Sequence, residues 1–438
     1  MPRRAVTTRG QWLSLGAVLL LGACGTEPSA VLTITLDDVP SPVRSATVAI
    51  SGLVTRTPAK ETTIIVTAAG GQTAASDTAG VGGRFTVEVS LNPNTRHQIV
   101  LTAQDASGAV SLPDTVFVEH DGVAPSVVST TPEGDGAGTA VSVEVQFSEP
   151  VVLTGAGALE LVNQGLSVAG ATTLSADSLT ATFVPQQALQ ENAIYTIGFP
   201  GVTDAAGNPV EEGLTRCFIT ELTAATGTEL DSTNDLFALG QPTGASPADL
   251  VEIRLGAETG RLLGVLKFTT PRQFEPDSAN NAFAYLDLDL DQDSTTGFVT
   301  LKDALFSTLD PTLSSGARAE YVIGLDWFPS LADSGAVGRY VDTGVFEIVA
   351  LLLPDVCGEF FGFSVSFGLL GSDDGNFNYV VLAGNVEANG ILVDPAPQSG
   401  HYTAGLAGQF ASPFIAESDV ARRSPGQVVR ARFPFRRR

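Results

Sequence analysis

Histidine is nearly absent from this chain of 438 residues, and its scarcity limits the possible catalytic chemistry. There are three histidines, His97, His120 and His401, and each lies in a different segment. The sequence has no His-Glu-x-x-His helix, Cys-x-x-Cys pair, Gly-x-Ser-x-Gly elbow or phosphate loop. We therefore expect a protein that is not an enzyme. The paired carboxylates of a glycoside hydrolase stay open as an alternative, because such pairs form only in space.

Basic residues are also few, with 23 Lys and Arg against 48 Asp and Glu and a formal net charge of -25. The basic residues are concentrated at the ends, since Arg3, Arg4 and Arg9 open the chain and seven arginines lie beyond residue 421. The segment between them is therefore more acidic than the net charge indicates. An acidic surface repels phosphate backbones, so we expect no nucleic acid as partner. Such a surface favours solubility and the binding of cations.

Cysteine occurs three times, as Cys24, Cys217 and Cys357. If Cys24 has another role, only Cys217 and Cys357 remain to form a disulfide. These two lie far apart in the sequence and in different predicted modules. An exported chain permits a disulfide between them, but geometry decides whether it forms. We expect two separate buried thiols.

The N-terminus has the layout of a secretory signal. Three arginines precede an apolar run from Trp12 to Leu21, which is shorter than the ~20 residues that span a bilayer. The run ends in Leu21-Gly22-Ala23-Cys24, which resembles the lipobox of bacterial lipoproteins. The resemblance implies that residues 1–24 hold a signal peptide with its lipobox, that Cys24 is acylated, and that lipid anchors the chain to a membrane. Gly25, in place of the retention signal Asp, favours the outer membrane and the cell surface.

Strands joined by turns are predicted throughout, because Gly (46), Pro (25), Val and Thr are abundant. After a tether at residues 25–43, with a stray strand at 32–36, residues 44–121 alternate in strand fashion. Arg84–Leu91 and Ile99–Gly108 resemble the "GxFTVxVxL" and "ITLTAxDxxG" motifs of bacterial Ig-like repeats. We read Asp105–Gly108 as a turn.

A second module is predicted at residues 122–222. Ala124–Pro132, Val141–Val151, Tyr195–Gly198 and Asp204–Asn208 contain "AP-V-STxP", "V-FSEPV", "YT" and "DxxGN" motifs in that order. This order is similar to the Ig-like domain of bacterial surface-layer and surface-anchored proteins. The resemblance implies a spacer or an adhesive module at the cell surface.

Residues 223–405 are patterned differently, and we expect a larger, jelly-roll-like β-sandwich there. Its motifs at 231–235, 285–297, 373–385 and 394–401 resemble DOMON-type domains and family 9 carbohydrate-binding modules. The resemblance implies sugar binding, for which Tyr285 and Trp327 are the candidate stacking rings, with a core or rim position as the alternative.

Haem binding, a further DOMON-type property, is disfavoured. The only methionine is Met1, which leaves with the signal, so only His401 could serve as a ligand. The remaining residues, 406–438, are rich in Pro and Arg, and we predict a disordered basic tail.

Four aspartates alternate with other residues at the end of the predicted strand 283–290 and just beyond it. They are Asp287, Asp289, Asp291 and Asp293. Alternate residues of a strand lie roughly 6.6 Å apart, whereas the oxygens bound to one calcium ion lie ~2.3–2.6 Å from it. A calcium site therefore requires the chain to curl after Asp289, and Ser294–Gly297 can form such a turn. We predict a Ca²⁺ site at Asp289, Asp291 and Asp293, with a solvated acidic turn as the alternative.

The sequence thus predicts an all-β, lipid-anchored protein of the cell envelope, with tandem Ig-like sandwiches followed by a larger β-sandwich. The expected function is that of a spacer or adhesive protein, with the membrane and another surface protein as partners. The alternative is polysaccharide capture through residues 223–405.

Overall fold

The computed structural model describes residues 29–155, 157–211, 216–222, 228–242, 247–258, 260–272, 281–306, 310–325, 335–371, 375–387, 390–406 and 428–430. Cys24 and Trp327 lie outside these ranges. The chain forms two compact units, which divide between Gly122 and Val123. Among the described residues, no helix has the length and apolar character needed to cross a membrane. The prediction of an all-β protein is confirmed.

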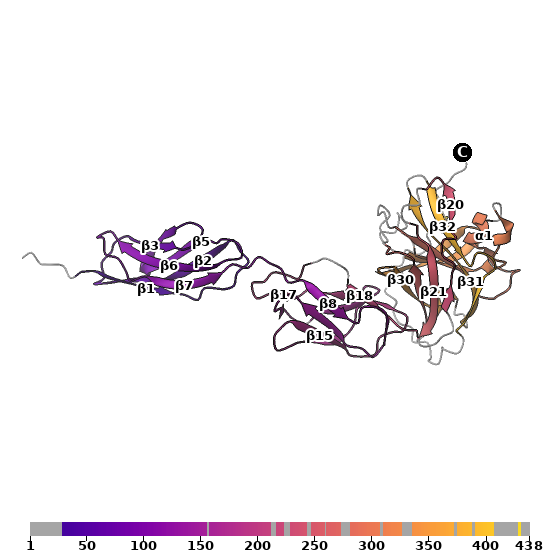
Figure 1. The fold of residues 1–438 in the computed structure, drawn as a ribbon, viewed down its shortest axis with the longest axis horizontal. Coiled ribbons are helices and arrows are strands. Elements are labelled where there is room, and N and C mark those ends of the chain that lie inside the picture. Colours follow the sequence, from indigo (N-terminus) through magenta and orange to yellow (C-terminus); the bar gives the residue numbers. More distant parts are fainter. Residues whose placement is uncertain are drawn as a thin grey trace, which may run out of the picture. The chain divides into compact units, whose positions relative to one another are not determined.

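The first module, residues 29–122, is a sandwich of a three-stranded and a four-stranded sheet, ordered β1-β2-β5 and β4-β3-β6-β7 (Figure 1). The strands are β1 (Val31–Leu36), β2 (Thr47–Thr57), β3 (Ile64–Ala69), β4 (Ala75–Thr78), β5 (Arg84–Ser90), β6 (Arg96–Asp105) and β7 (Asp114–Glu119). Alternate residues point into one core, which contains Ile50, Val66 and Leu101. The sequence assigned residues 25–43 to a tether, but β1 pairs with β2 over its whole length and buries Leu32 in this core.

The second module, residues 123–222, is a smaller sandwich with its own core. Its main sheets have the orders β14-β15-β10-β8 and β13-β12-β16-β18-β9. The strands are β8 (Val127–Thr131), β9 (Gly134–Ala137), β10 (Val143–Phe147), β11 (Val152–Leu153), β12 (Glu160–Asn163), β13 (Leu166–Ser167), β14 (Gly170–Leu174), β15 (Thr180–Pro185), β16 (Ile194–Gly198), β17 (Val202–Thr203) and β18 (Arg216–Thr220). The predicted turn at 204–208 forms, because Asp204 accepts a hydrogen bond from the backbone N–H of Asn208.

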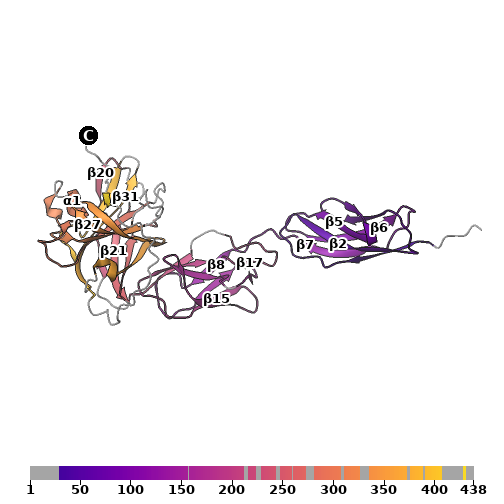
Figure 2. The same cartoon turned by 180° about the vertical axis from the view of Figure 1, so that it is seen from behind.

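The C-terminal sandwich, residues 228–406, packs a five-stranded sheet, β19-β21-β22-β30-β29, against a larger sheet (Figures 1 and 2). The larger sheet has the order β20-β32-β31-β23-β26-β27-β28-β34, and β33 also pairs with β31. The elements of the C-terminal sandwich, both sheets included, are β19 (Thr228–Leu230), β20 (Phe237–Gly240), β21 (Leu250–Glu258), β22 (Arg261–Phe268), β23 (Phe283–Asp289), β24 (Phe298–Val299), α1 (Leu301–Phe306), β25 (Arg318–Ala319), β26 (Tyr321–Leu325), β27 (Gly335–Asp342), β28 (Val345–Leu352), β29 (Asp355–Cys357), β30 (Phe360–Ser366), β31 (Asn376–Glu387), β32 (Gly390–Ala396), β33 (Tyr402–Gly405) and β34 (Val428–Arg430).

Strand β34 lies in the segment predicted to be a disordered tail. Its three residues pair with β28 in antiparallel register, at the edge of the larger sheet. This part of the tail is therefore ordered, because the open edge of β28 offers it a ladder of backbone hydrogen-bonding groups.

The larger sheet is covered on both faces, and β23 shows the division most clearly. Leu286 and Leu288 point into the core between the two sheets. Asp287 lies on the other face, where its carboxylate accepts hydrogen bonds from the backbone N–H of Leu301 at 2.6 Å and from the hydroxyl of Tyr340 at 2.6 Å. Leu301 belongs to α1, which packs into a second apolar cluster on this face. The alternating Leu and Asp of the sequence therefore mark two covered faces.

Cys217 of β18 and Cys357 of β29 form a disulfide. The expectation of two separate thiols is wrong, because strands from two modules bring the Cα atoms to 5.8 Å, within the range of a disulfide. The second module and the C-terminal sandwich accordingly lie in one compact unit.

Candidate metal centre and the module junction

A cluster of three carboxylates lies where β23 ends. Asp289, Asp291 and Glu320 each offer an oxygen within 4.8 Å of the others. Two oxygens on opposite sides of a calcium ion lie up to about 5 Å apart, so this spacing suits one ion. The strand ends at Asp289, and the chain then turns, as the calcium prediction requires. Glu320 comes from the segment just before β26, which pairs with β23.

The oxygens of this cluster are unequally satisfied. Asp289 is 2% exposed, and one of its oxygens accepts from Asn378 at 3.1 Å. The other oxygen of Asp289 and Oε1 of Glu320 are buried and have no hydrogen-bond partner among the described residues. Burial, together with the charges of Asp291 and Asp289, raises the pKa of Glu320 to about 7. A cation at this point would restore the ionised form of the cluster.

Gly297 leaves room for the Glu320 carboxylate. Its φ is +70°, and a Cβ atom at this position would lie 2.3 Å from Oε1 of Glu320. Only glycine combines this left-handed backbone with so close an approach. The turn that follows the acidic run is therefore shaped around Glu320.

Asp293, the third predicted ligand, is not part of the cluster. Its Oδ1 accepts from the backbone N–H of Thr295 at 2.9 Å and from the hydroxyl of Thr295 at 2.6 Å. These bonds lower the pKa of Asp293 and hold its exposed side chain in the turn. Sequence reasoning missed Glu320, because only the pairing of β23 with β26 brings it to the site.

Tyr285, a candidate stacking ring, is half-buried in β23. It packs against the apolar cluster that includes Phe283, and the two ring centroids are 5.7 Å apart. This packing leaves only part of the ring accessible. The other candidate, Trp327, lies outside the described residues.

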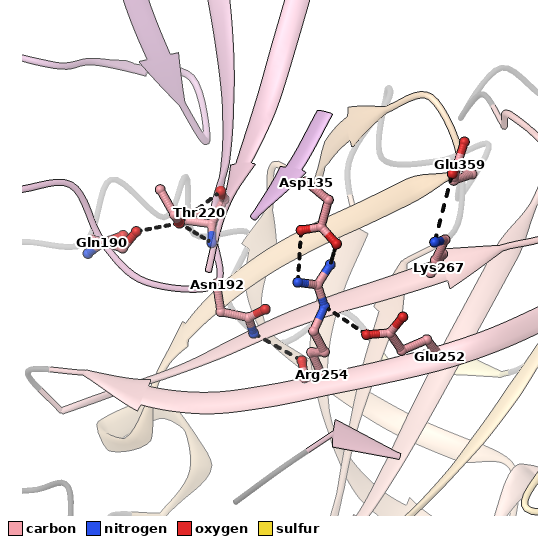
Figure 3. A network of polar contacts seen from close by, with 9 residues as sticks. Asp135, Gln190, Asn192, Thr220, Glu252, Arg254, Lys267 and Glu359 are labelled. Carbon is pink, nitrogen blue, oxygen red and sulfur yellow. Dashed lines mark hydrogen bonds and ion pairs between the residues drawn. The ribbon is translucent and has the colours of Figure 1, made fainter. Parts of the chain in front are cut away.

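Arg254 of β21 is central to the junction between the second module and the C-terminal sandwich (Figure 3). Its guanidinium donates to both oxygens of Asp135 in β9, at 2.9 and 3.0 Å, and pairs with Glu252 at 3.2 Å. Its centre also lies 5.6 Å from the ring centroid of Phe360. Arg254 is only 7% exposed. The two-pronged geometry fixes both distance and orientation across the junction.

Polar contacts to backbone groups surround this ion pair. Asn192 of the second module donates to the carbonyl oxygen of Arg254 at 3.0 Å (Figure 3). In the same direction, the backbone N–H of Gln164 in the second module donates to the carboxylate of Asp355 in β29 at 2.9 Å. Burial raises the pKa of Asp355 to about 7.

An apolar cluster completes the junction. Ile194 and Ile219 of the second module pack with Val265 and Phe360 of the C-terminal sandwich, beside the disulfide. The junction thus combines a covalent bond, a buried ion pair and apolar packing.

A cleft of about 770 Å³ lies beside this junction, between the β12–β13 hairpin and the ends of β28 and β30. Arg261 is its charged lining residue, and its Nε donates to the hydroxyl of Ser364 at 2.6 Å. Within the described lining there is no carboxylate.

Residues 121–220 match the model of a family described as a bacterial Ig-like domain. No curated protein matches the chain. Among solved structures, the N-terminal part of the bacterial S-layer protein SbsC is 15% identical, with a TM-score of 0.19, and the match covers 34% of this chain and 41% of that one.

A titin I-band fragment is 10% identical, with a TM-score of 0.27, and the match covers 85% of this chain and 96% of that one. A Ca²⁺-stabilized adhesin of an Antarctic bacterium is 16% identical, with a TM-score of 0.23, and the match covers 86% of this chain and 73% of that one. Residues 121–220 thus form a bacterial Ig-like domain. The other two modules are defined by the strands that the structure describes.

Proposed function

We propose that this protein is a non-enzymatic, lipid-anchored component of the cell envelope, in which Ig-like modules serve as spacers or adhesive modules for the C-terminal sandwich. The observation that carries the proposal is the junction between the second module and that sandwich. A bacterial Ig-like domain at residues 121–220 agrees with a role at the cell surface. The lipid anchor rests on the lipobox that ends in Cys24.

The junction suits a spacer because it couples two modules firmly. A disulfide across a sequence separation of 140 residues removes much of the freedom of the unfolded chain, worth about 5 kcal/mol in the loop-entropy description. Disulfides persist in oxidising compartments outside the cytosol. A disulfide and an ion pair together hold one module in a fixed position relative to the other, which a flexible linker does not.

Calcium at Asp289, Asp291 and Glu320 is the second part of the proposal. A cation there would neutralise a buried cluster and stabilise the end of β23 by mass action. Extracellular modules bind calcium with dissociation constants of about 10⁻⁴–10⁻³ M, which suits a site assembled from few protein ligands.

The test of the anchor uses cells supplied with labelled fatty acid. Wild-type protein should take up the label and partition into detergent, and intact cells should expose it to added protease. Cys24→Ser should lose the label, whereas Cys217→Ser is the matched control and should keep it. Label on the Cys24→Ser protein, or full protection from protease on intact cells, would refute the proposed location.

A further inference from the structure

A second group of carboxylates converges in the C-terminal sandwich, away from the cluster at the end of β23. Asp231 directly follows β19, Asp235 precedes β20, and Asp394 lies in β32. One oxygen of each residue lies within 4.8 Å of the others. The pairing of β20 with β32 brings the loop that carries Asp235 beside Asp394.

Each of these carboxylates uses one oxygen on a protein donor. Asp394 Oδ2 accepts from the backbone N–H of Leu250 at 2.6 Å, and Asp235 Oδ2 accepts from Gln398 Nε2 at 2.8 Å. Asp231 Oδ1 lies 3.5 Å from the hydroxyl of Tyr402.

The second oxygen of each aspartate is buried and has no hydrogen-bond partner within the described ranges. Asp394 is fully buried, with 0% of its surface exposed. An unpaired buried carboxylate oxygen costs free energy unless a proton or a cation compensates it. Three carboxylates that converge, each with an unpartnered buried oxygen, therefore indicate a missing positive charge.

Other charged groups near the cluster do not form an ion pair with it, although the charge of Lys302 interacts with Asp231. Asp249 adds a fourth carboxylate, although both its oxygens accept from the backbone N–H of Asn234. Lys302 on α1 donates its Nζ to the carbonyl oxygens of Pro397 and Gly400. Arg272 donates to the carbonyl oxygen of Pro247. In the part of the chain that the structure describes, Asp231, Asp235 and Asp394 form no ion pair with these cations.

We propose that Asp231, Asp235 and Asp394 bind a divalent calcium ion. Hard cations take carboxylate oxygens as ligands, and the observed spacing fits oxygens at 2.3–2.6 Å from one Ca²⁺. The ion would fasten the loop between β19 and β20 to β32. This loop follows the second module in the sequence, so the ion would fix the first segment of the C-terminal sandwich.

The test is equilibrium dialysis of the full-length protein with radioactive calcium. Wild-type protein should bind two ions, one at each carboxylate cluster. Asp235→Asn should lose one ion, and Glu320→Gln should lose the other. Asp342→Asn removes an exposed acid of β27 that belongs to neither cluster, and this matched control should bind two ions.

Binding to Asp235→Asn that equals wild-type binding overturns the inference, and Asp231→Asn repeats the test if the first variant fails to fold. If Glu320→Gln changes nothing while Asp235→Asn loses an ion, the site inferred here stands and the calcium of the proposed function does not. A shared proton is the competing explanation. In that case Asp394→Asn raises the melting temperature equally with calcium and with chelator, which also overturns the inference.

Discussion

Two buried aspartates, Asp105 of the first module and Asp394 of the C-terminal sandwich, have opposite surroundings. Asp105 accepts from Ser107 Oγ at 2.6 Å, from Arg56 Nε at 2.8 Å and from the backbone N–H of Ala109 at 3.0 Å. These bonds, that from Ser107 first, hold its pKa well below the usual range. Asp394 has one backbone donor and two carboxylate neighbours, and burial, followed by the charge of Asp231, raises its pKa well above the usual range.

The comparison teaches where each module obtains its compensating charge. The first module neutralises its buried acid with its own arginine and turn. The C-terminal sandwich buries several acids, and two groups of them converge with unpartnered oxygens. The first module therefore compensates this buried acid internally, whereas the ions proposed above would supply the missing charge in the C-terminal sandwich.

The largest expected effect comes from removing the disulfide. Replacing both Cys217 and Cys357 with Ser should lower the unfolding free energy of the second unit by about 5 kcal/mol, because the unfolded chain regains the freedom of a long loop. Denaturant unfolding of the full chain measures this change. The first module has no cysteine, so its transition is the internal control. An unchanged midpoint for the second unit would contradict the account.

The ion pair at the junction should contribute less. Arg254→Ala should cost about 2–3 kcal/mol, because Asp135 and Glu252 lose their partner at a partly buried site. Arg254→Lys is the matched variant, since it keeps the charge but cannot donate to both oxygens of Asp135. Equal stability of the alanine variant and the wild type would show that the ion pair does not stabilise the junction.

A pH effect is expected at Asp355. Its pKa is about 7 in the folded protein against an ordinary value of 3.8, so the folded state retains a proton that the unfolded state has released. Its contribution to stability is therefore present below about pH 4 and is lost as the pH rises to about 7.

Asp355→Asn should remove this dependence and gain on the order of 1–2 kcal/mol at pH 8, since one pKa unit corresponds to about 1.4 kcal/mol. Urea unfolding at pH 4 and pH 8 tests the prediction. If the variant and the wild type keep the same difference at both pH values, Asp355 does not titrate as described.

The smallest effect concerns Asp293, which the sequence grouped with the calcium ligands. Asp293→Asn should change the melting temperature by less than about 1 °C, because the side chain is exposed and bonds only within its own turn. Differential scanning calorimetry, with Glu320→Gln beside it, checks the contrast. A larger loss for Asp293→Asn than for Glu320→Gln would restore the ligand set predicted from sequence.

Local patterns were sufficient for much of the fold. The alternation of apolar and polar residues predicted β2, β5 and β6. The Asp-x-Ser-Gly pattern predicted the turn that Asp105 closes. The need for a curl after Asp289 followed from the spacing of strand residues alone. These features depend on neighbours in sequence, whose geometry the backbone constrains.

Features that depend on distant pairing could not be predicted. Glu320 reaches Asp289 through the register of β23 with β26, and Cys217 meets Cys357 through the packing of two modules. The cluster of Asp231, Asp235 and Asp394 likewise needs the pairing of β20 with β32. Nothing in the spacing of these residues along the chain specifies such contacts.

The most direct test of the contrast between the two units is thermal unfolding of the full chain with calcium and with chelator. The transition that moves when the disulfide is reduced belongs to the second unit. Calcium at a hundred times its dissociation constant should stabilise that unit by about 2.7 kcal/mol for each site, a shift of several degrees, and leave the first module unchanged. Equal melting of the second unit with calcium and with chelator would contradict the account.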